Sequence, residues 1–202
     1  EQALKQMKEL EKEGHKCYDI PAGGANAIGS LGFAQGFIEL IEQTLSQGIK
    51  NVDYIAHATG TGGTLAGLLA GKALLHSDVN ILSFTVGDTA QDYKQQVVKR
   101  ANESLSLLGL ENLVSPKDTN INTKYYGEGY EIPTMQATNA LKLLAREEGI
   151  FLDPVYTAKA MSGLIDYIER GKIPQGSNIV FWHTGGATGL FAEKKIIGDI
   201  DV

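Results

Sequence analysis

Short apolar runs alternate with helical patterns along most of this chain. Apolar runs with the length of buried strands lie at 52–58, 80–86 and 178–183. The first two runs are separated by one helical pattern, at 64–75. Strand, crossover helix and strand in repetition predict an α/β fold, a mainly parallel, twisted sheet with helices on both faces. Ligands of such sheets bind outside the carboxyl ends of the strands, and glycine-rich loops follow two of these runs.

The other expected elements complete this pattern. We expect a short strand at 16–20 followed by a turn at 21–24, and irregular structure at 115–133. Helices are expected at 1–13, 31–45, 89–108, 134–148 and 157–170. The 202 residues fit one domain with part of a second.

Composition excludes several classes of protein. Apolar residues make up 43% and charged residues 21%, as in globular domains. The 18 basic and 24 acidic side chains leave a net charge of −6 without a basic cluster, which argues against a nucleic-acid or anionic-membrane partner. The uncharged windows 20–38, 54–71 and 173–192 are too rich in Gly, Thr, Ser and Asn for membrane spans.

The ends and the single cysteine lead to further expectations. Cys17 cannot form an intramolecular disulfide, so we expect a cytoplasmic protein. Residues 1–13 lack the apolar run of a signal peptide, and the missing initiator Met indicates that the chain begins inside a longer protein.

The loop at 57–67, HATGTGGTLAG, carries the strongest chemical signal. It lies between an expected strand and an expected helix. Adjacent glycines allow the backbone to turn its N–H groups toward one point, Thr61 and Thr64 add hydroxyl donors, and the helix N-terminus adds positive partial charge. We therefore expect a pocket for a phosphate dianion. The alternative is a tight strand-to-helix turn that needs glycine only for packing.

Two common phosphate motifs do not match this loop. A dinucleotide-binding fingerprint starting at Gly60 requires a small residue where Leu65 stands. A P-loop requires four residues between its glycines and a Ser or Thr where Ala73 stands, and neither condition is met.

Two further glycine clusters and several tyrosines are candidates. The clusters lie at 182–189, WHTGGATG, and at 21–29, PAGGANAIG. His183 is expected to be a packed histidine rather than a base. Tyr130 and Tyr156 lie beside expected loops, where a phenol can donate a proton; the alternative for each is an interfacial tyrosine with a satisfied hydroxyl. The four histidines show no metal-ligand spacing, so no metal site is expected.

Together these motifs resemble one family. Five motifs follow the order found in D-cysteine desulfhydrase and 1-aminocyclopropane-1-carboxylate (ACC) deaminase. They are IPAGGAN at 20–26, TGGT at 61–64, GY at 129–130, LDPVYT at 152–157 and HTGG at 183–186. These are fold type II, tryptophan synthase β-like, pyridoxal phosphate enzymes. The resemblance implies a large cofactor-binding domain, incomplete at its N-terminal side, over residues 1–202.

The resemblance also implies site residues. Thr61, Gly62, Gly63 and Thr64 are similar to the cradle for the 5′-phosphate of pyridoxal 5′-phosphate, in agreement with the loop chemistry. Thr184 is similar to the residue that faces the pyridine nitrogen. Tyr130 and Tyr156 match active-site tyrosines that handle substrate and protons.

The chain departs from the family in its N-terminal region. The family's Schiff-base lysine lies in an Asn-Lys segment that is followed by a Ser-Asn-His segment, and the 202 residues contain neither. None of the 15 lysines is a convincing substitute. We expect the small domain and this lysine to lie outside the chain, and the chain alone to be inactive.

Three functions follow for the parent protein. The first is α,β-elimination of D-cysteine to pyruvate, hydrogen sulfide and ammonia by a cytoplasmic homodimer acting on a small amino-acid substrate. The second is ACC deamination, which is disfavoured because the deaminase has a glutamate where this chain has Thr157. The third is an inactive fragment that binds phosphate-bearing ligands or pairs with another subunit.

Overall fold

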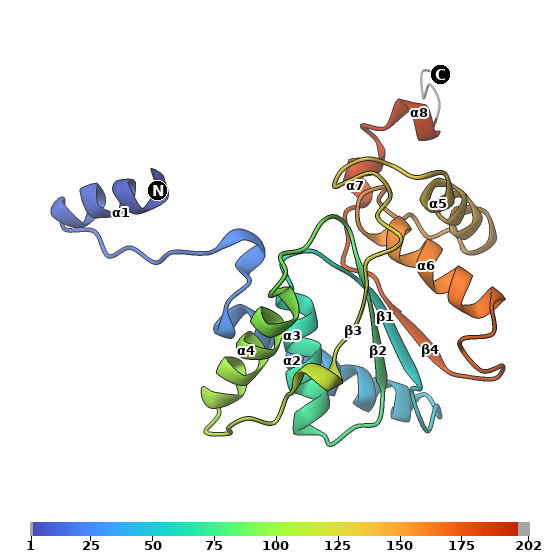
Figure 1. The fold of residues 1–202 in the computed structure, drawn as a ribbon, viewed down its shortest axis with the longest axis horizontal. Helices are drawn as coiled ribbons and strands as arrows, with labels where there is room; N and C mark the ends of the chain where they lie inside the picture. The colour runs from blue at the N-terminus through green and yellow to red at the C-terminus, as the bar shows by residue number, and fades with distance from the viewer. Residues whose placement is uncertain (1, 198–202) are drawn as a thin grey trace.

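A parallel four-stranded sheet lies at the centre of the computed structural model, which describes residues 2–197 (Figure 1). The strand order is β3-β2-β1-β4, and every neighbouring pair is parallel. The carboxyl ends of the strands therefore lie at one edge. The strands are β1 (Tyr54–Thr59), β2 (Asn80–Thr85), β3 (Asn120–Asn122) and β4 (Ile179–Trp182).

Helices cover both faces of the sheet (Figure 1). One face packs against α2 (Ala27–Ser46), α3 (Gly63–Leu74) and α4 (Tyr93–Ser106). The other packs against α5 (Met135–Glu148) and α6 (Thr157–Glu169). The short helices α7 (Ala187–Leu190) and α8 (Lys194–Ile197) follow β4, and α1 (Gln2–Lys12) lies away from the sheet without a buried residue. The predicted α/β class and its two helical layers are confirmed.

Alternation along β1 divides the core into these two layers. Ile55 packs in the core beneath α2, α3 and α4, whereas Ala56 and Ala58 pack in the core beneath α5 and α6. Because successive side chains of a strand point to opposite faces, His57 and Thr59 share the α3 side with Ile55. Polar side chains are thus buried next to the loop that follows β1.

Two glycines of α3 allow α2 to approach closely. A Cβ at Gly71 would lie 2.6 Å from Phe37 Cβ and 2.8 Å from the Ala34 carbonyl oxygen. Gly67 faces the same helix, where an added Cβ would lie 2.5 Å from Phe33 Cβ. This contact places α2, and with it Phe33, beside the carboxyl edge of the sheet.

The structure corrects two expectations about secondary structure. Residues 16–20 form no strand; apart from half-buried Cys17 they are exposed and pair with nothing in the described sheet. The stretch 115–133 is not wholly irregular, because it contains β3 and the 3₁₀ helix η2 (Pro116–Asp118). The short helices after β4 carry too few residues for a helical period, and β3 is defined only by its pairing with β2.

Most other predicted elements are confirmed within a few residues. The turn at 21–24 is the 3₁₀ helix η1 (Ala22–Gly24), and the expected helix at 1–13 is α1, with residue 1 outside the described part. Within residues 2–197, no helix combines the length and the apolar character needed to cross a membrane.

Gly71→Ala tests the contact between α2 and α3. We expect the free energy of unfolding to fall by about 1–2 kcal/mol, because overpacking costs about 1–3 kcal/mol and alanine returns up to about 1 kcal/mol of helix propensity. Urea unfolding followed by circular dichroism measures the change.

Gly32→Ala is the matched control, because it lies within α2 and a Cβ there would meet open space. Its free energy of unfolding should rise by up to about 1 kcal/mol. Equal stabilisation by both substitutions would contradict the close contact at Gly71.

Candidate functional site

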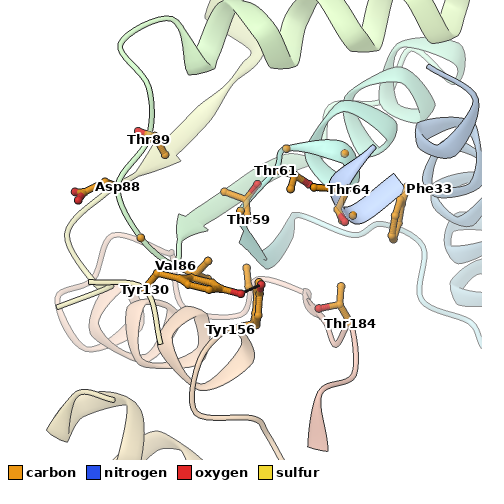
Figure 2. A pocket seen from close by; sticks show the side chains of 17 residues that line it. Phe33, Thr59, Thr61, Thr64, Val86, Asp88, Thr89, Tyr130, Tyr156 and Thr184 are labelled. Atoms are coloured by element: carbon orange, nitrogen blue, oxygen red, sulfur yellow. Dashed lines mark hydrogen bonds between the residues drawn. The ribbon is translucent and has the colours of Figure 1, made fainter. Parts of the chain in front are cut away.

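One cavity at the carboxyl edge of the sheet is lined by every site residue predicted from the sequence (Figure 2). Its volume is about 530 Å³, which is within the range of about 300–1,000 Å³ typical of small-molecule sites. The predicted residues on its wall are Thr61, Gly62, Gly63, Thr64, Tyr130, Tyr156 and Thr184. They come from the ends of two strands, β1 and β4, and from two further loops, so the fold brings together what the sequence separates by more than 120 residues.

The loop after β1 presents unpaired main-chain donors to this cavity. Gly62 has φ 83° and precedes α3 without a side-chain cap. Within residues 2–197, the amides of Gly62, Gly63 and Thr64 donate no hydrogen bond. Free N–H groups at a helix N-terminus, together with the positive end of the helix dipole, bind phosphate groups.

Side chains of α4 support this loop from the side away from the cavity. The Arg100 guanidinium donates to the Thr61 carbonyl oxygen at 2.9 Å, and the Tyr93 hydroxyl is 2.8 Å from Thr59 Oγ1. A Cβ at Gly62 would lie 2.7 Å from Val97 Cγ2. Burial raises the pKa of Tyr93, so its hydroxyl remains a neutral hydrogen-bonding group beneath the loop.

His57 belongs to the scaffold beneath the loop and does not line the cavity. It is fully buried between Ser83 Oγ, 2.8 Å from Nε2, and the Ala58 carbonyl oxygen, 2.8 Å from Nδ1. Burial lowers its pKa to about 4, against the opposing effect of the Ala58 hydrogen bond. The neutral ring donates through Nδ1 to the carbonyl and accepts from the Ser83 hydroxyl through Nε2.

A pair of tyrosines forms the opposite wall of the cavity. The hydroxyls of Tyr130 and Tyr156 are hydrogen-bonded to each other, and the rings meet edge to face with centroids 5.7 Å apart (Figure 2). Partial burial, the Tyr130 hydroxyl and the carboxylates of Asp153 and Glu131 raise the pKa of Tyr156 to about 12. The phenol is therefore protonated throughout the neutral range and is available as a donor.

Thr184 lines the cavity from the turn that follows β4. Its hydroxyl has no hydrogen-bond partner among residues 2–197, so it is not used to hold the turn. His183 does that instead: Nδ1 accepts from the Gly185 amide at 3.0 Å and Nε2 donates to the Phe151 carbonyl oxygen at 2.9 Å. The expectation that His183 is packed is wrong, because it is exposed.

Several cavity residues were not expected from the sequence. Gly87, Asp88 and Thr89 follow β2 directly, and their position at the carboxyl end of a buried strand was a signal that could have found them. Phe33 reaches the cavity from α2. Ala22 and Gly23 also line it, and they belong to the glycine cluster at 21–29 that was a candidate from the sequence. No local pattern marks Phe33, because only the contact of α2 with α3 brings it there.

Comparison with known proteins decides the family. Residues 1–185 match the family model described as pyridoxal-phosphate dependent enzyme. The crystal structure of an ACC deaminase homologue has 34% sequence identity and a TM-score of 0.83, over 96% of this chain and 57% of that one.

The chain belongs to the pyridoxal-phosphate dependent enzymes. Its fold is that of fold type II, and the predicted cofactor, pyridoxal 5′-phosphate, is confirmed. The structure of O-ureido-L-serine synthase, at 14% identity and a TM-score of 0.58 over 88% of this chain and 52% of that one, shares the fold. The chain thus spans little more than half the length of these two structures.

The described residues fit this cofactor. The unpaired amides of the loop at 61–64 suit a phosphate dianion. Thr184 lines the same cavity, and its hydroxyl suits a polar atom of the cofactor ring. The apolar ring of Phe33 and the side chain of Val86 provide surface for an aromatic ring.

Gly62→Ala in the full-length protein tests the phosphate cradle. We expect affinity for pyridoxal 5′-phosphate to fall at least about tenfold, because a positive φ disfavours alanine by about 1–2 kcal/mol and the new methyl group would displace the loop from Val97. Titration with the cofactor, followed by absorbance, measures this affinity.

Gly48→Ala provides the control, since Gly48 has φ 82° and lies in open space after α2. It should lower stability without changing cofactor affinity. Unchanged affinity in Gly62→Ala would mean that the phosphate binds elsewhere.

Proposed function

We propose that the full-length protein containing this chain is a lyase that eliminates hydrogen sulfide from D-cysteine. The observation that carries the proposal is the hydrogen-bonded pair Tyr130 and Tyr156, facing the free amides of the loop at 61–64 across one cavity. The overall reaction is D-cysteine plus water to pyruvate, hydrogen sulfide and ammonia, in which the Cβ–S bond breaks and sulfur leaves with its electron pair.

The residues of this chain have separate parts in that reaction. Bound pyridoxal phosphate supplies an electron sink for negative charge at the substrate α-carbon. The amides of Gly62, Gly63 and Thr64 hold the phosphate and so fix the position of the substrate. Tyr156 donates its phenolic proton to the departing sulfur, and Tyr130 orients that phenol through their shared hydrogen bond.

Thr157 favours D-cysteine over ACC as the substrate. In the deaminase branch a glutamate occupies this position, whereas the Thr157 hydroxyl is buried and donates to Asp153 Oδ1 at 2.7 Å. Thr157 therefore offers the cavity no carboxylate. ACC deamination is the second candidate, because a structure described as an ACC deaminase homologue matches at 34% identity.

Tyr156→Phe in the full-length protein tests the proposed proton donor. Sulfide release from D-cysteine should fall about 100-fold or more, the usual contribution of a positioned acid, with little change in cofactor affinity. Sulfide and pyruvate are assayed in parallel, with D-cysteine and ACC as alternative substrates.

Tyr167→Phe is the control, because Tyr167 lies near the other end of α6, where its hydroxyl accepts from Asn122. Its activity should match the wild type. If the protein forms ammonia and 2-oxobutyrate from ACC but releases no sulfide from D-cysteine, its reaction is ACC deamination and the proposed elimination is wrong.

Thr184 is proposed to face the pyridine nitrogen of the cofactor. Its hydroxyl lines the cavity and is not used by any described neighbour. A neutral hydroxyl does not stabilise a protonated pyridine as a carboxylate does, so the ring remains a moderate electron sink. Such a ring favours prompt loss of a β-substituent over racemisation or transamination.

Thr184→Asp should therefore change the chemistry as well as the rate. We expect the absorption spectrum of the bound cofactor to shift and the share of racemised or transaminated product to rise, because the new carboxylate stabilises a protonated ring. Spectra and product ratios identical to those of the wild type would rule out the contact.

Several features of the parent protein remain predictions. We propose a cytoplasmic homodimer, with residues 1–202 forming part of the large cofactor-binding domain and the family's lysine lying in the remaining sequence. The 202 residues by themselves should release no sulfide from D-cysteine, because they contain no Asn-Lys segment.

A further inference from the structure

Two buried charged side chains lie at the start of α6, just behind the tyrosine pair. Asp153 is 3% exposed and Lys159 is fully buried, and neither lines the cavity. Charged groups are seldom buried unless they are paired or hydrogen-bonded. The proposed reaction uses neither of them, so their hydrogen bonds should show what they do.

The Asp153 carboxylate holds the backbone that carries Tyr156. Oδ2 accepts from the amides of Val155 and Tyr156 at 2.9 and 2.8 Å, and Oδ1 accepts from the amide and the hydroxyl of Thr157 at 2.8 and 2.7 Å. These donors belong to the N-terminus of α6, where a negative charge is favoured. Tyr156 is thereby fixed through its own main chain.

Asp153 also contacts the turn that presents Thr184. A Cβ at Gly186 would lie 2.8 Å from Asp153 Cγ and 2.9 Å from its Oδ1. Gly186 has φ 91°, so both the conformation of the turn and its distance from the carboxylate require glycine.

Lys159 performs the corresponding task for Tyr130. Its ammonium donates to the Gly129 carbonyl oxygen at 2.9 Å and to the Val86 carbonyl oxygen at 3.4 Å. Gly129 directly precedes Tyr130, and Val86 directly follows β2. Tyr130 lies in an irregular stretch without a ladder or helix to hold it, so this ammonium joins its backbone to the sheet.

We propose that Asp153 and Lys159 are positioning residues that hold Tyr130 and Tyr156 in hydrogen-bond contact. Asp153 acts through the amide of Tyr156, and Lys159 acts through the carbonyl before Tyr130. The catalytic importance of this contact rests on the proposed function, whereas the contact itself does not. Charge is needed at both positions: a carboxylate accepts all four hydrogen bonds, and an ammonium donates to two carbonyls at once.

Lys159→Met in the full-length holoenzyme tests the proposal, and the exposed Lys142→Met is its control. We expect kcat for sulfide release to fall about 100-fold, as misplacement by about 1 Å can cause. Affinity for pyridoxal 5′-phosphate should stay within about threefold of the wild type, because the phosphate loop is held separately by α4.

The tyrosines provide a readout that is independent of the reaction. In protein labelled with ¹³C at tyrosine Cζ, the Tyr156 resonance, assigned with Tyr156→Phe, reports whether the phenol is ionised. Wild-type Tyr156 should stay protonated up to pH 11, given that partial burial, followed by Tyr130, Asp153 and Glu131, raises its pKa to about 12. In Lys159→Met the pKa should fall toward 10, the ordinary value for tyrosine.

The direction of that change separates positioning from electrostatics. Removing a positive charge near Tyr156 would by itself raise the pKa of the phenol, whereas loss of the contact with Tyr130 lowers it. Lys159→Gln, which retains an amide donor, should recover part of the wild-type kcat and resonance position.

The control for Asp153→Asn is Asp166→Asn, because the Asp166 carboxylate lies within α6 and accepts from the Tyr125 hydroxyl at 2.5 Å. Only Asp153→Asn should alter the Tyr156 resonance and kcat. An unchanged Tyr156 resonance in both Lys159→Met and Asp153→Asn overturns the proposal. If either variant fails to fold, an unchanged resonance in Lys159→Gln overturns it instead. A wild type without activity on D-cysteine refutes the proposed function alone.

Discussion

Parallel pairing of β1 with β2 and β4 is the constraint on which the rest of the site depends. Thr59 is in register with Thr85, and His57 with Trp182, so three strands end at nearly the same level. The loops that follow them must meet at one edge of the sheet, and the cavity lies there (Figure 2). Each loop supplies a different chemical group, because strand pairing fixes where a loop lies but does not fix its sequence.

Main-chain groups, rather than positively charged side chains, are the donors that the loop at 61–64 offers at the cavity. The chain carries a net charge of −6, yet the loop at 61–64 presents free amides and the positive end of α3. Arg100 adds a positive charge behind the loop through its bond to the Thr61 carbonyl oxygen. Overall charge is therefore a poor guide to what this protein binds.

The two walls of the cavity are held by different means. The loop at 61–64 is continuous with a strand and a helix and packs against α4, so regular structure fixes it. The tyrosine wall belongs to irregular segments, and side-chain bonds of Asp153 and Lys159 hold the main chain at Tyr156 and next to Tyr130. A substitution in the second wall should therefore displace the tyrosines before it displaces the loop at 61–64.

The sequence alone determined the fold class, and it singled out the loop at 61–64 and, through resemblance, the seven candidate residues that line one cavity. The period of the apolar residues and the spacing of the glycines are local properties of the sequence, so they can be recognised without a structure. The tertiary structure alone decided the existence of β3, the absence of a strand at 16–20 and the cavity wall at Phe33, since strand pairing and helix contact join distant residues. It also revealed Asp153 and Lys159, because a buried charge is defined by the partners that surround it, and those partners lie up to 73 residues away.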